Sequence, residues 1–523
     1  MHDLEATSSQ PLQASPEPRV FCVLGAEPEV QAYAMAKYSR SSLPLTQTLA
    51  ELNGQKAEKF LNTFYFQYGH RSIADLAHLA LGIERLSLLA ATLVVDEQRW
   101  DGQERSTRYQ DFQKSGYHVP ELGSAELTRD YCQALDTLFD EYREISAQIL
   151  AHLMAKTPRP AEMAEEAYRR TLKARAFDVA RYLLPLATNT SLGQIVSART
   201  LECQIARLLA DPHAEARLLG ELLKQAATRG AYDVNRKAYE ELIAAIAEKD
   251  AGLAEKASAL LLHEVTPAPT LVKYAQPEQY RIASARELSQ AAAELMKGAA
   301  IDSAAEVTLL DADPVELELA TTLLYEQTHY SYQQLREAVA ALPEKRREEI
   351  IQLGVRHRGA HDELARAYHC GQGFRFDILM DIGGYRDMHR HRRCTQIHQS
   401  YCFAHGFDTP EEVAAAGLTE RYESAMRQAR ASAGVLETRL RENGTEVEHA
   451  QYLIPLAYRK RTLFQMDLAE AVYISELRTG VAGHFSYRNI AWKMYYAVTQ
   501  KHPALEQLFR VTDVHAPVDL LKR

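Results

Sequence analysis

The chain repeats itself, and this repetition constrains its fold more than any single motif does. A short apolar strand leads into residues 26–28 (Ala-Glu-Pro) and another into 312–314 (Ala-Asp-Pro), and a helix is predicted after each. Residues 180–187 and 450–457 differ at only two positions. A serine-centred segment recurs between these landmarks. Chance rarely produces three similarities in the same order, so the chain is predicted to be a divergent tandem duplication.

The length agrees with two domains, because 523 residues exceed what one hydrophobic core usually supports. Prolines within 266–270 and at Pro277 interrupt the helical pattern and indicate a linker, after which 285–297 reads as a helix. We expect three parts: a disordered tail at residues 1–18, an N-terminal domain at 19–290 and a C-terminal domain at 291–523.

Helical periodicity fills the space between the landmarks. In the second repeat, Thr409, Pro410 and Glu412 are typical of a helix N-cap, first-turn proline and capping-box glutamate, leading into a helix at 419–441. In the first repeat, one apolar face predicts a long core helix rather than a cofactor site; it carries Leu127, Tyr131, Leu135, Leu138, Tyr142, Ile145 and Ile149.

Charge and cysteine content narrow the classes of partner. The net charge of −10 argues against extensive nucleic-acid binding, although a local basic segment at 386–393 suits a small anionic ligand in a pocket. No stretch approaches the roughly twenty apolar residues of a membrane span. The cysteines form no Cys-x-x-Cys pair, so we expect neither a zinc knuckle nor a disulfide framework, and a cytoplasmic protein; they are Cys22, Cys132, Cys203, Cys370, Cys394 and Cys402.

The most informative motif is Arg390-His391-Arg392, followed after seven residues by Ser400. It places two guanidiniums and an imidazole beside a hydroxyl that suits a phosphate. A solvated basic patch is the alternative interpretation. Aligning Ser106 with Ser400 puts the acidic segment 96–98 opposite the motif, so the charge is reversed in the first repeat.

Arg-His-Arg, seven residues and Ser resembles the signature of the flavin-dependent thymidylate synthases, and the second repeat matches it fully. The resemblance implies an α+β fold of two tandem domains, each with a central antiparallel sheet flanked by long helices. It also implies FAD as cofactor. The implied reaction is reductive methylation of deoxyuridine monophosphate (dUMP) to dTMP, with methylene-tetrahydrofolate as carbon donor and NADPH as reductant.

The same resemblance assigns roles to residues of the first repeat. His70, Ser72 and Asp75 are similar to the family's flavin-contacting His, hydroxyl and Glu, with Asp75 in place of Glu; the alternative is a helix that begins at Ile73 and is capped by the His and Ser. Arg199 matches a flavin-contacting arginine. The family's contacts to the nucleotide phosphate are matched by Glu104, Ser106 and Arg108, whereas Cys402 replaces Arg108 in the second repeat and cannot bind a phosphate.

In the second repeat, the resemblance implies that Arg390 and Arg392 are catalytic and hold the flavin together with His391. Preorganised arginines of this kind each contribute on the order of 3 kcal/mol to a transition state. Arg478 matches the nucleotide-activating arginine, although a helix C-terminal arginine is the alternative. The remaining implied contacts are Asp467, in place of a flavin-contacting Asn, the flavin-proximal His484, and Ser400 for the substrate. Less exact counterparts of the family's residues are Arg207 and His213 in the first repeat and His361 in the second.

A metal site is not predicted. Four histidines near the motif have spacings seen in metal sites, but the neighbouring arginines would repel a dication. These histidines are His389, His391, His398 and His405.

The family's sites lie between the subunits of a homotetramer, so this chain is expected to form a homodimer, a four-domain pseudo-tetramer with composite sites. In them Ser72, Arg108 and Arg199 would meet Arg390, Arg392 and Arg478. The alternatives are a catalytically silent flavin- or nucleotide-binding scaffold, and a flavoenzyme acting on another uridine nucleotide. RNA methylation is disfavoured by the acidic balance.

Overall fold

The computed structural model describes residues 26–37, 73–302, 305–310, 315–357, 365–368, 373–466, 468–503, 506 and 509–521. The predicted tail, the apolar strand before residue 26, His70, Ser72, His361 and Asp467 lie outside the described residues. No helix within these ranges is both long and apolar enough to cross a membrane.

The first repeat is built on a small antiparallel sheet with strand order β1-β3-β2. Ser87, at the end of β1, accepts a hydrogen bond from the backbone N–H of Ala90 at 2.9 Å, which caps the next helix. The strands are β1 (His78–Ser87), β2 (Asp101–Glu104) and β3 (Asn189–Ser197), and the helices are α1 (Pro28–Lys37), α4 (Leu88–Val94), α5 (Ala125–Lys156), α6 (Glu165–Ala180), η3 (Arg181–Leu183), α7 (Ala198–Leu209) and α8 (Ala214–Thr228).

The second repeat has the same plan and, among the described residues, one more strand, in the order β4-β5-β7-β6. Asp381, at the end of β5, caps its helix as Ser87 does, accepting from the N–H of Gly384 at 2.6 Å. The strands are β4 (Val307–Leu309), β5 (Phe374–Asp381), β6 (Thr395–His398) and β7 (Arg459–Met466), and the helices are α15 (Ile382–Met388), α16 (Glu411–Ala415), α17 (Thr419–Glu442), η5 (Val447–Leu453), α18 (Leu468–Thr479) and α19 (Phe485–Lys501). Helices mixed with small antiparallel sheets agree with the predicted α+β class.

The two repeats join through the most similar pair of landmark segments. The N–H of Leu186 donates to Ile454 O at 2.9 Å, and in return the N–H of Leu456 donates to Leu184 O at 3.0 Å. Ala187 N–H to Tyr452 O and Ala457 N–H to Tyr182 O repeat this exchange at 2.9 and 3.1 Å. Because each bond has a counterpart in which the two repeats exchange roles, the repeats are related by a local pseudo-two-fold axis.

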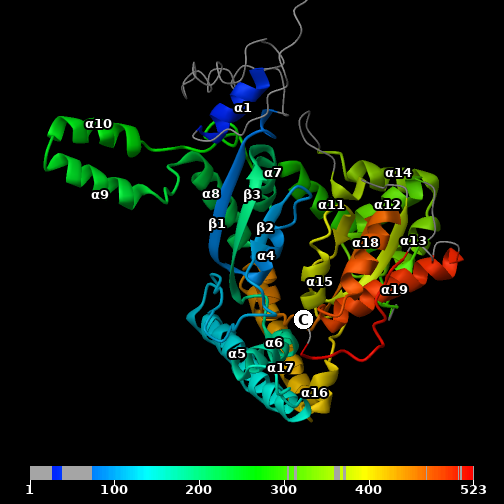
Figure 1. The fold of residues 1–523 in the computed structure, drawn as a ribbon. Helices are drawn as coiled ribbons and strands as arrows, with labels where there is room; N and C mark the ends of the chain where they lie inside the picture. Colours follow the sequence, from blue (N-terminus) through cyan, green and yellow to red (C-terminus); the bar gives the residue numbers. More distant parts are fainter. Residues whose placement is uncertain are drawn as a thin grey trace, which may run out of the picture.

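The long helices α5 and α17 lie together at the base of the molecule (Figure 1). Every residue of the apolar face predicted for α5 is buried, which confirms that helix as part of the core. The predicted capping box at Thr409 is wrong: Pro410 is the N-cap residue and no side chain caps α16. Gly417, with φ of +72°, separates α16 from α17, because a left-handed residue interrupts the helix there.

The segment between the repeats adds helices of its own. α9 (Arg236–Ala247) and α10 (Ala251–Leu261) form a hairpin that projects from the body (Figure 1), and α11 (Gln279–Leu295) follows them. Within the second repeat, one side of the sheet is covered by α12 (Val315–Tyr325), α13 (Tyr332–Ala340), α14 (Glu344–Leu353) and η4 (Arg366–Tyr368). The helix expected at 285–297 is α11, which begins earlier. Residue 290 lies within it, and the domain boundary itself stays a prediction.

Candidate functional site

The Arg390-His391-Arg392 motif lies in the turn between α15 and β6, where it faces α18. Arg478 Nε, in the last turn of α18, donates to His391 Nε2 at 2.7 Å. Glu470 Oε1, in the first turn of α18, is 3.4 Å from His391 Nδ1. Burial lowers the pKa of His391, the Glu470 carboxylate opposes this shift and the Arg478 charge adds to it. A neutral imidazole is therefore held between the two ends of α18.

Arg392 reaches across to the first repeat. Its guanidinium lies 4.5 Å from the ring centroid of Trp100, a cation–π contact. Trp100 is fixed by a 2.7 Å hydrogen bond from its indole N–H to Gln194 on β3. Burial and the charge of Arg390 lower the pKa of Arg392, and its buried Nε has no hydrogen-bond partner among the described residues. Arg390 itself is exposed.

Arg108 connects the repeats from the other side. Its Nε donates to Asp178 Oδ1, one terminal nitrogen to the Tyr487 hydroxyl and the other to Ala482 O, each at 2.9 Å. The guanidiniums of Arg108 and Arg478 lie 5.5 and 5.4 Å from the centroid of the Tyr487 ring. The expected meeting of Arg108 with Arg478 is therefore observed around Tyr487.

Asp178 is the buried carboxylate at this junction. Besides Arg108, its Oδ1 lies 3.1 Å from His484 Nδ1 and 3.6 Å from Arg181 Nε. Burial raises the pKa of Asp178, but His484, Arg181 and Arg108 outweigh it and hold that pKa well below its usual range. The Tyr182 hydroxyl shares a 2.9 Å hydrogen bond with His484 Nε2. His484 is thus fixed on both ring nitrogens.

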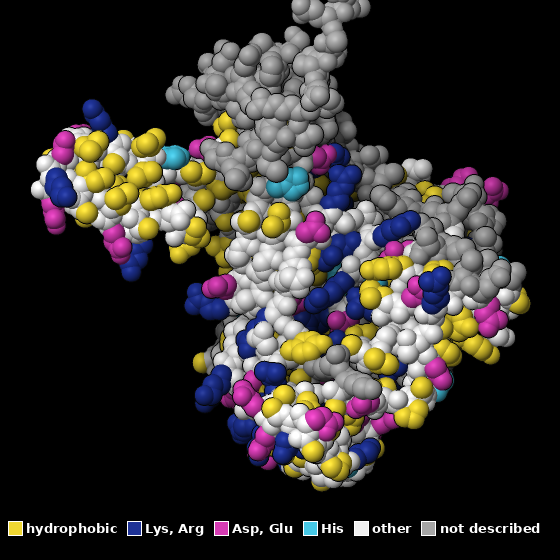
Figure 2. All heavy atoms as spheres, in the orientation of Figure 1, with side chains coloured by type: hydrophobic (Ala, Val, Ile, Leu, Met, Phe, Trp, Pro, Cys, Tyr) yellow, Lys and Arg dark blue, Asp and Glu magenta, His cyan; other side chains and the backbone are white. Residues whose placement is uncertain are grey.

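Positive charge predominates here. Burial raises the pKa of Asp387, yet Arg181, Arg108, Arg390 and Arg478 together lower it below its usual value. Figure 2 shows Lys and Arg side chains gathered in the hollow between the two halves. We call the following set the first junction: Arg108, Asp178, Arg181, Asp387, Arg390, His391, Glu470, Arg478, His484 and Tyr487. Its four arginines outnumber its three carboxylates, so an anion entering it would face an excess of positive charge.

The acidic segment 96–98, which aligns with the basic motif of the second repeat, forms ion pairs of its own. Asp96 Oδ1 is 2.8 Å from Arg366 and 3.0 Å from His389 Nε2, both in the second repeat. Burial raises the pKa of Asp96, but the charge of Arg366 and those of the neighbouring histidines lower it well below its usual value. Glu97 pairs with Arg207 at 2.8 Å. Asp96 therefore neutralises Arg366 of the second repeat, whereas Glu97 neutralises Arg207 within the first repeat.

The other sequence-predicted residues fall into separate contacts. Asp75 pairs with Arg199 at 3.1 Å, and residues 73–77 form turns that lead into β1, so the helix considered at Ile73 is absent from this described stretch. Glu104 forms an ion pair with Arg386, and Ser106 Oγ accepts from the N–H of Arg108 at 3.3 Å. Ser400 is exposed after β6.

Sequence reasoning missed several residues of the first junction. Tyr487 and Glu470 carry no motif of their own. Asp178 lies two residues before the repeated landmark at 180–187, and Asp387 lies three residues before Arg390, so their placement beside recognised segments was the available signal.

Comparison with known proteins identifies the repeats. The model of the family described as "Thymidylate synthase complementing protein" (Thy1) matches residues 23–229 and again residues 316–504. A UPF0159 protein of Chlamydia pneumoniae is 27% identical over 96% of this chain and 93% of its own length. Those of Chlamydia muridarum and Thermoplasma acidophilum are 27% and 26% identical, covering 94% and 92% of this chain and 92% and 94% of their own lengths.

One solved structure is also similar, at a low level. It is a UMP/dUMP methylase PolB from Streptomyces cacaoi bound with 5-Br dUMP, 15% identical over 38% of this chain and 84% of that chain, with a TM-score of 0.26. At that score the likeness supports no conclusion about this chain.

Proposed function

The chain belongs to the Thy1 family and carries two copies of its domain in tandem, and from this premise we propose that it methylates dUMP reductively to dTMP, with FAD as cofactor, methylene-tetrahydrofolate as carbon donor and NADPH as reductant. The observation that carries the proposal is the first junction. There His391 and Arg478 of one repeat lie close to Arg108 of the other, around Tyr487 and Asp387. We propose domains at 19–290 and 291–523, and a homodimer that forms a four-domain pseudo-tetramer.

The donors at this place suit a flavin and a nucleotide. Arg392 offers a buried Nε without a hydrogen-bond partner in the described part of the chain, next to the Trp100 face, and Arg390 adds permanent positive charge. Such groups match the phosphates of FAD and the anionic ring of its reduced form. When bound, the flavin would supply the reducing electrons. The protein's own part would be to orient the nucleotide and to stabilise negative charge on its pyrimidine through Arg478.

The direct test is an anaerobic single turnover of FAD-loaded protein with NADPH, methylene-tetrahydrofolate and dUMP, followed by mass spectrometry of the nucleotide. We expect the nucleotide to gain one methyl group. Flavin reduction without a methylated nucleotide would contradict dUMP as the substrate, and failure to bind FAD would contradict the flavoenzyme.

Arg478→Ala is expected to lower the rate of this turnover about a hundredfold, because it removes a preorganised donor while FAD binding is retained. The rate of dTMP formation and the FAD dissociation constant should be measured together. Arg441→Ala, at an exposed position of α17 where the arginine forms its ion pair with Glu437 of the same helix, is the control and should leave both unchanged. An undiminished rate in the Arg478 variant would remove this arginine from the reaction.

Arg390→Ala is expected to weaken FAD binding roughly tenfold to a hundredfold, the size of a lost charged hydrogen bond, without changing the fold. Arg390 is exposed, so the substitution leaves no buried group unpaired. Arg393, exposed in the same turn, provides a matched control as Arg393→Ala. Fluorescence titration of FAD against both variants decides between a specific role of Arg390 and a general effect of positive charge.

The second candidate function is flavin or nucleotide binding without turnover, or turnover of another uridine nucleotide. Arg108 favours it, because all three of its guanidinium nitrogens already donate to protein acceptors. A phosphate would have to compete with these bonds or use the remaining N–H groups. In the second repeat Cys402 stands where the first repeat has Arg108, so the corresponding loop there lacks a phosphate-binding arginine altogether.

A further inference from the structure

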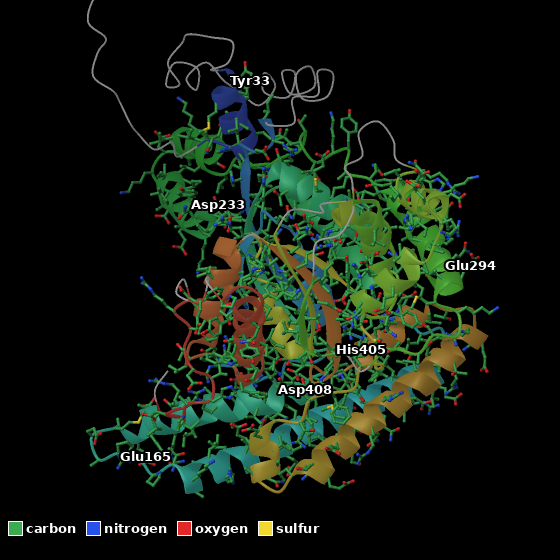
Figure 3. All side chains as sticks on the ribbon, turned by 90° about the vertical axis from the view of Figure 1, so that its right-hand side faces the viewer. Tyr33, Glu165, Asp233, Glu294, His405 and Asp408 are labelled. Atoms are coloured by element: carbon green, nitrogen blue, oxygen red, sulfur yellow. The ribbon has the colours of Figure 1, made fainter. Side chains whose placement is uncertain are left out.

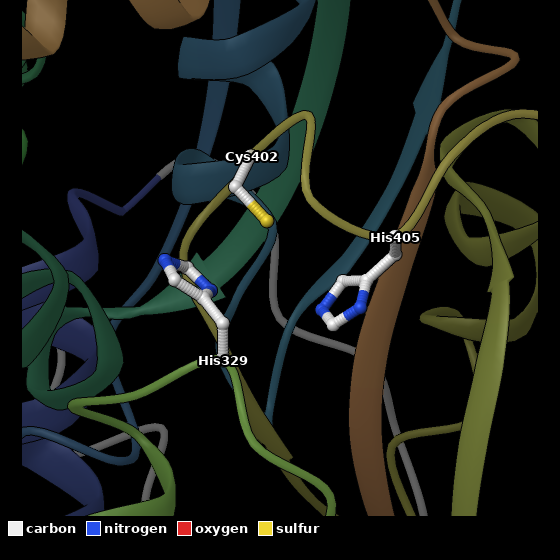
Figure 4. A group of neighbouring side chains, drawn as sticks. All are labelled: His329, Cys402 and His405. Atoms are coloured by element: carbon white, nitrogen blue, oxygen red, sulfur yellow. The ribbon is translucent and has the colours of Figure 1, made fainter. Parts of the chain in front are cut away.

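Three potential metal ligands converge at the counterpart of the phosphate loop in the second repeat. One ligand atom each from His329, Cys402 and His405 lies within 4.8 Å of the other two. Figure 4 shows the sulfur of Cys402 directed into the space between the two imidazole rings, which come from different loops. The rings are T-shaped, with centroids 6.2 Å apart.

The surrounding structure fixes the two loops that carry these residues. The buried side-chain amide of Gln399 donates to Tyr330 O at 2.9 Å, which joins the loop of His329 to the loop of Cys402. The N–H of Arg459 donates to Gly406 O at 2.9 Å and holds the turn after His405 against β7. Figure 3 shows His405 and Asp408 between the sheet and the long helices at the base. The three side chains are therefore presented by a preorganised frame.

Both histidines have buried ring nitrogens without a partner. His329 Nδ1 and His405 Nε2 have no hydrogen bond within the described part of the chain. A buried polar atom without a partner costs roughly 1 to 3 kcal/mol, so such a pair beside a thiol requires an explanation. Burial, with Lys460 adding to it, lowers the pKa of His329, and burial with Arg461 lowers that of His405 to about 4. Burial thus favours the neutral imidazole, the form that binds metals.

Neighbouring cations do not prevent a dication from binding. Arg461 is neutralised by Asp377 at 3.0 Å. Lys460 Nζ lies over the rings of Tyr401 and Tyr385, at 3.9 and 4.7 Å from their centroids, and these faces attract its charge. Burial raises the pKa of the Cys402 thiol, but coordination deprotonates a cysteine outright and would contribute one negative charge.

We propose that His329, Cys402 and His405 bind a Zn²⁺ ion. Two imidazoles and one thiolate are the ligand types that Zn²⁺ prefers, and three protein ligands leave the fourth tetrahedral position for water or a small ligand. Ligand atoms around a bound Zn²⁺ are roughly 3.5 Å apart, so small side-chain rotations would bring the present atoms, which lie within 4.8 Å of one another, to that spacing. The site is independent of the flavin reaction, and it replaces the expectation of no metal, which considered only histidines close together in sequence.

The absorption spectrum of Co²⁺ bound in place of Zn²⁺ shows whether a thiolate is among the ligands. Tag-free protein, stripped with a chelator and kept reduced, is titrated anaerobically with Co²⁺. We expect a thiolate-to-cobalt charge-transfer band that saturates at about one equivalent per chain and disappears when Zn²⁺ displaces the cobalt. No charge-transfer band in the unaltered protein at saturating Co²⁺ would overturn the proposal.

Variants identify the ligands. Cys402→Ser should abolish the band and weaken Zn²⁺ binding by at least about tenfold, since even outer-shell substitutions change metal affinity that much. His329→Ala should weaken Zn²⁺ binding as strongly. Cys132→Ser, a free cysteine on α5, is the control and should keep both the band and the affinity. A band that persists in folded Cys402→Ser protein, checked by circular dichroism, would overturn the assignment.

Discussion

Arg108→Ala is expected to lower the free energy of unfolding by roughly 3 to 5 kcal/mol, the usual cost of removing one partner from a buried ion pair. The substitution leaves the Asp178 carboxylate, the Tyr487 hydroxyl and Ala482 O without their donor. Asp178 keeps His484 and Arg181, so the fold should survive. Equilibrium denaturation in urea measures the loss.

Arg105 provides the matched control for this experiment. It stands three residues earlier in the same loop, and its donors go to Gln110, Ser115 and Asp111 O, all within the first repeat. Arg105→Ala should therefore cost no more than about 1 kcal/mol, as expected for an exposed contact. Equal losses in the two variants would show that Arg108 acts within its own repeat and does not join the repeats.

Lys460→Met is expected to make the chain more stable at neutral and acidic pH. Burial lowers the Lys460 pKa from 10.5 to about 7, which corresponds to on the order of 5 kcal/mol between its protonation states. Between these two values the unfolded chain binds more protons than the folded one, so the free energy of unfolding rises with pH. Methionine removes this rise. The free energy of unfolding of the variant should exceed that of the unaltered protein by up to about 5 kcal/mol below pH 7, and the two should converge near pH 10.5.

Other groups around Lys460 titrate as well. The quantity to measure is therefore the difference in the free energy of unfolding between Lys460→Met and the unaltered protein at each pH. Lys460 Nζ lies 3.9 Å from the Tyr401 ring centroid and 4.7 Å from that of Tyr385, and the carboxylate of Asp96 and the thiol of Cys402 raise its pKa. Measurements with a chelator keep metal out of the comparison. Lys493→Met, on a half-exposed lysine that pairs with Glu306, should not alter the pH dependence. Parallel pH profiles for Lys460→Met and the unaltered protein would exclude a neutral buried lysine.

The duplication and the long core helices could be predicted because they depend on local patterns. The repeated landmark at 180–187 survives in both repeats since its backbone pairs with the other copy, which limits how far its side chains can diverge. The encounter of Arg108 with Arg478 followed from the idea of composite sites, and the structure places both on Tyr487.

Contacts between segments distant in sequence could not be predicted. The four histidines near the motif separate into three environments: His389 and His398 beside Asp96, His391 at Glu470, and His405 at His329. His329 comes from a loop before α13, so no ligand spacing links it to Cys402. The flavin contacts predicted at His70, Ser72 and Asp467 stay predictions.

The reciprocal backbone bonds between 184–187 and 454–457 have an evolutionary consequence. In a homo-oligomer one gene encodes every subunit, so a substitution that damages one site damages all of them. Once two copies are covalently fused around a pseudo-two-fold axis, each half mutates on its own. One junction can then keep its arginine while the other exchanges it for a cysteine, and selection can act on two different pockets within one inherited frame.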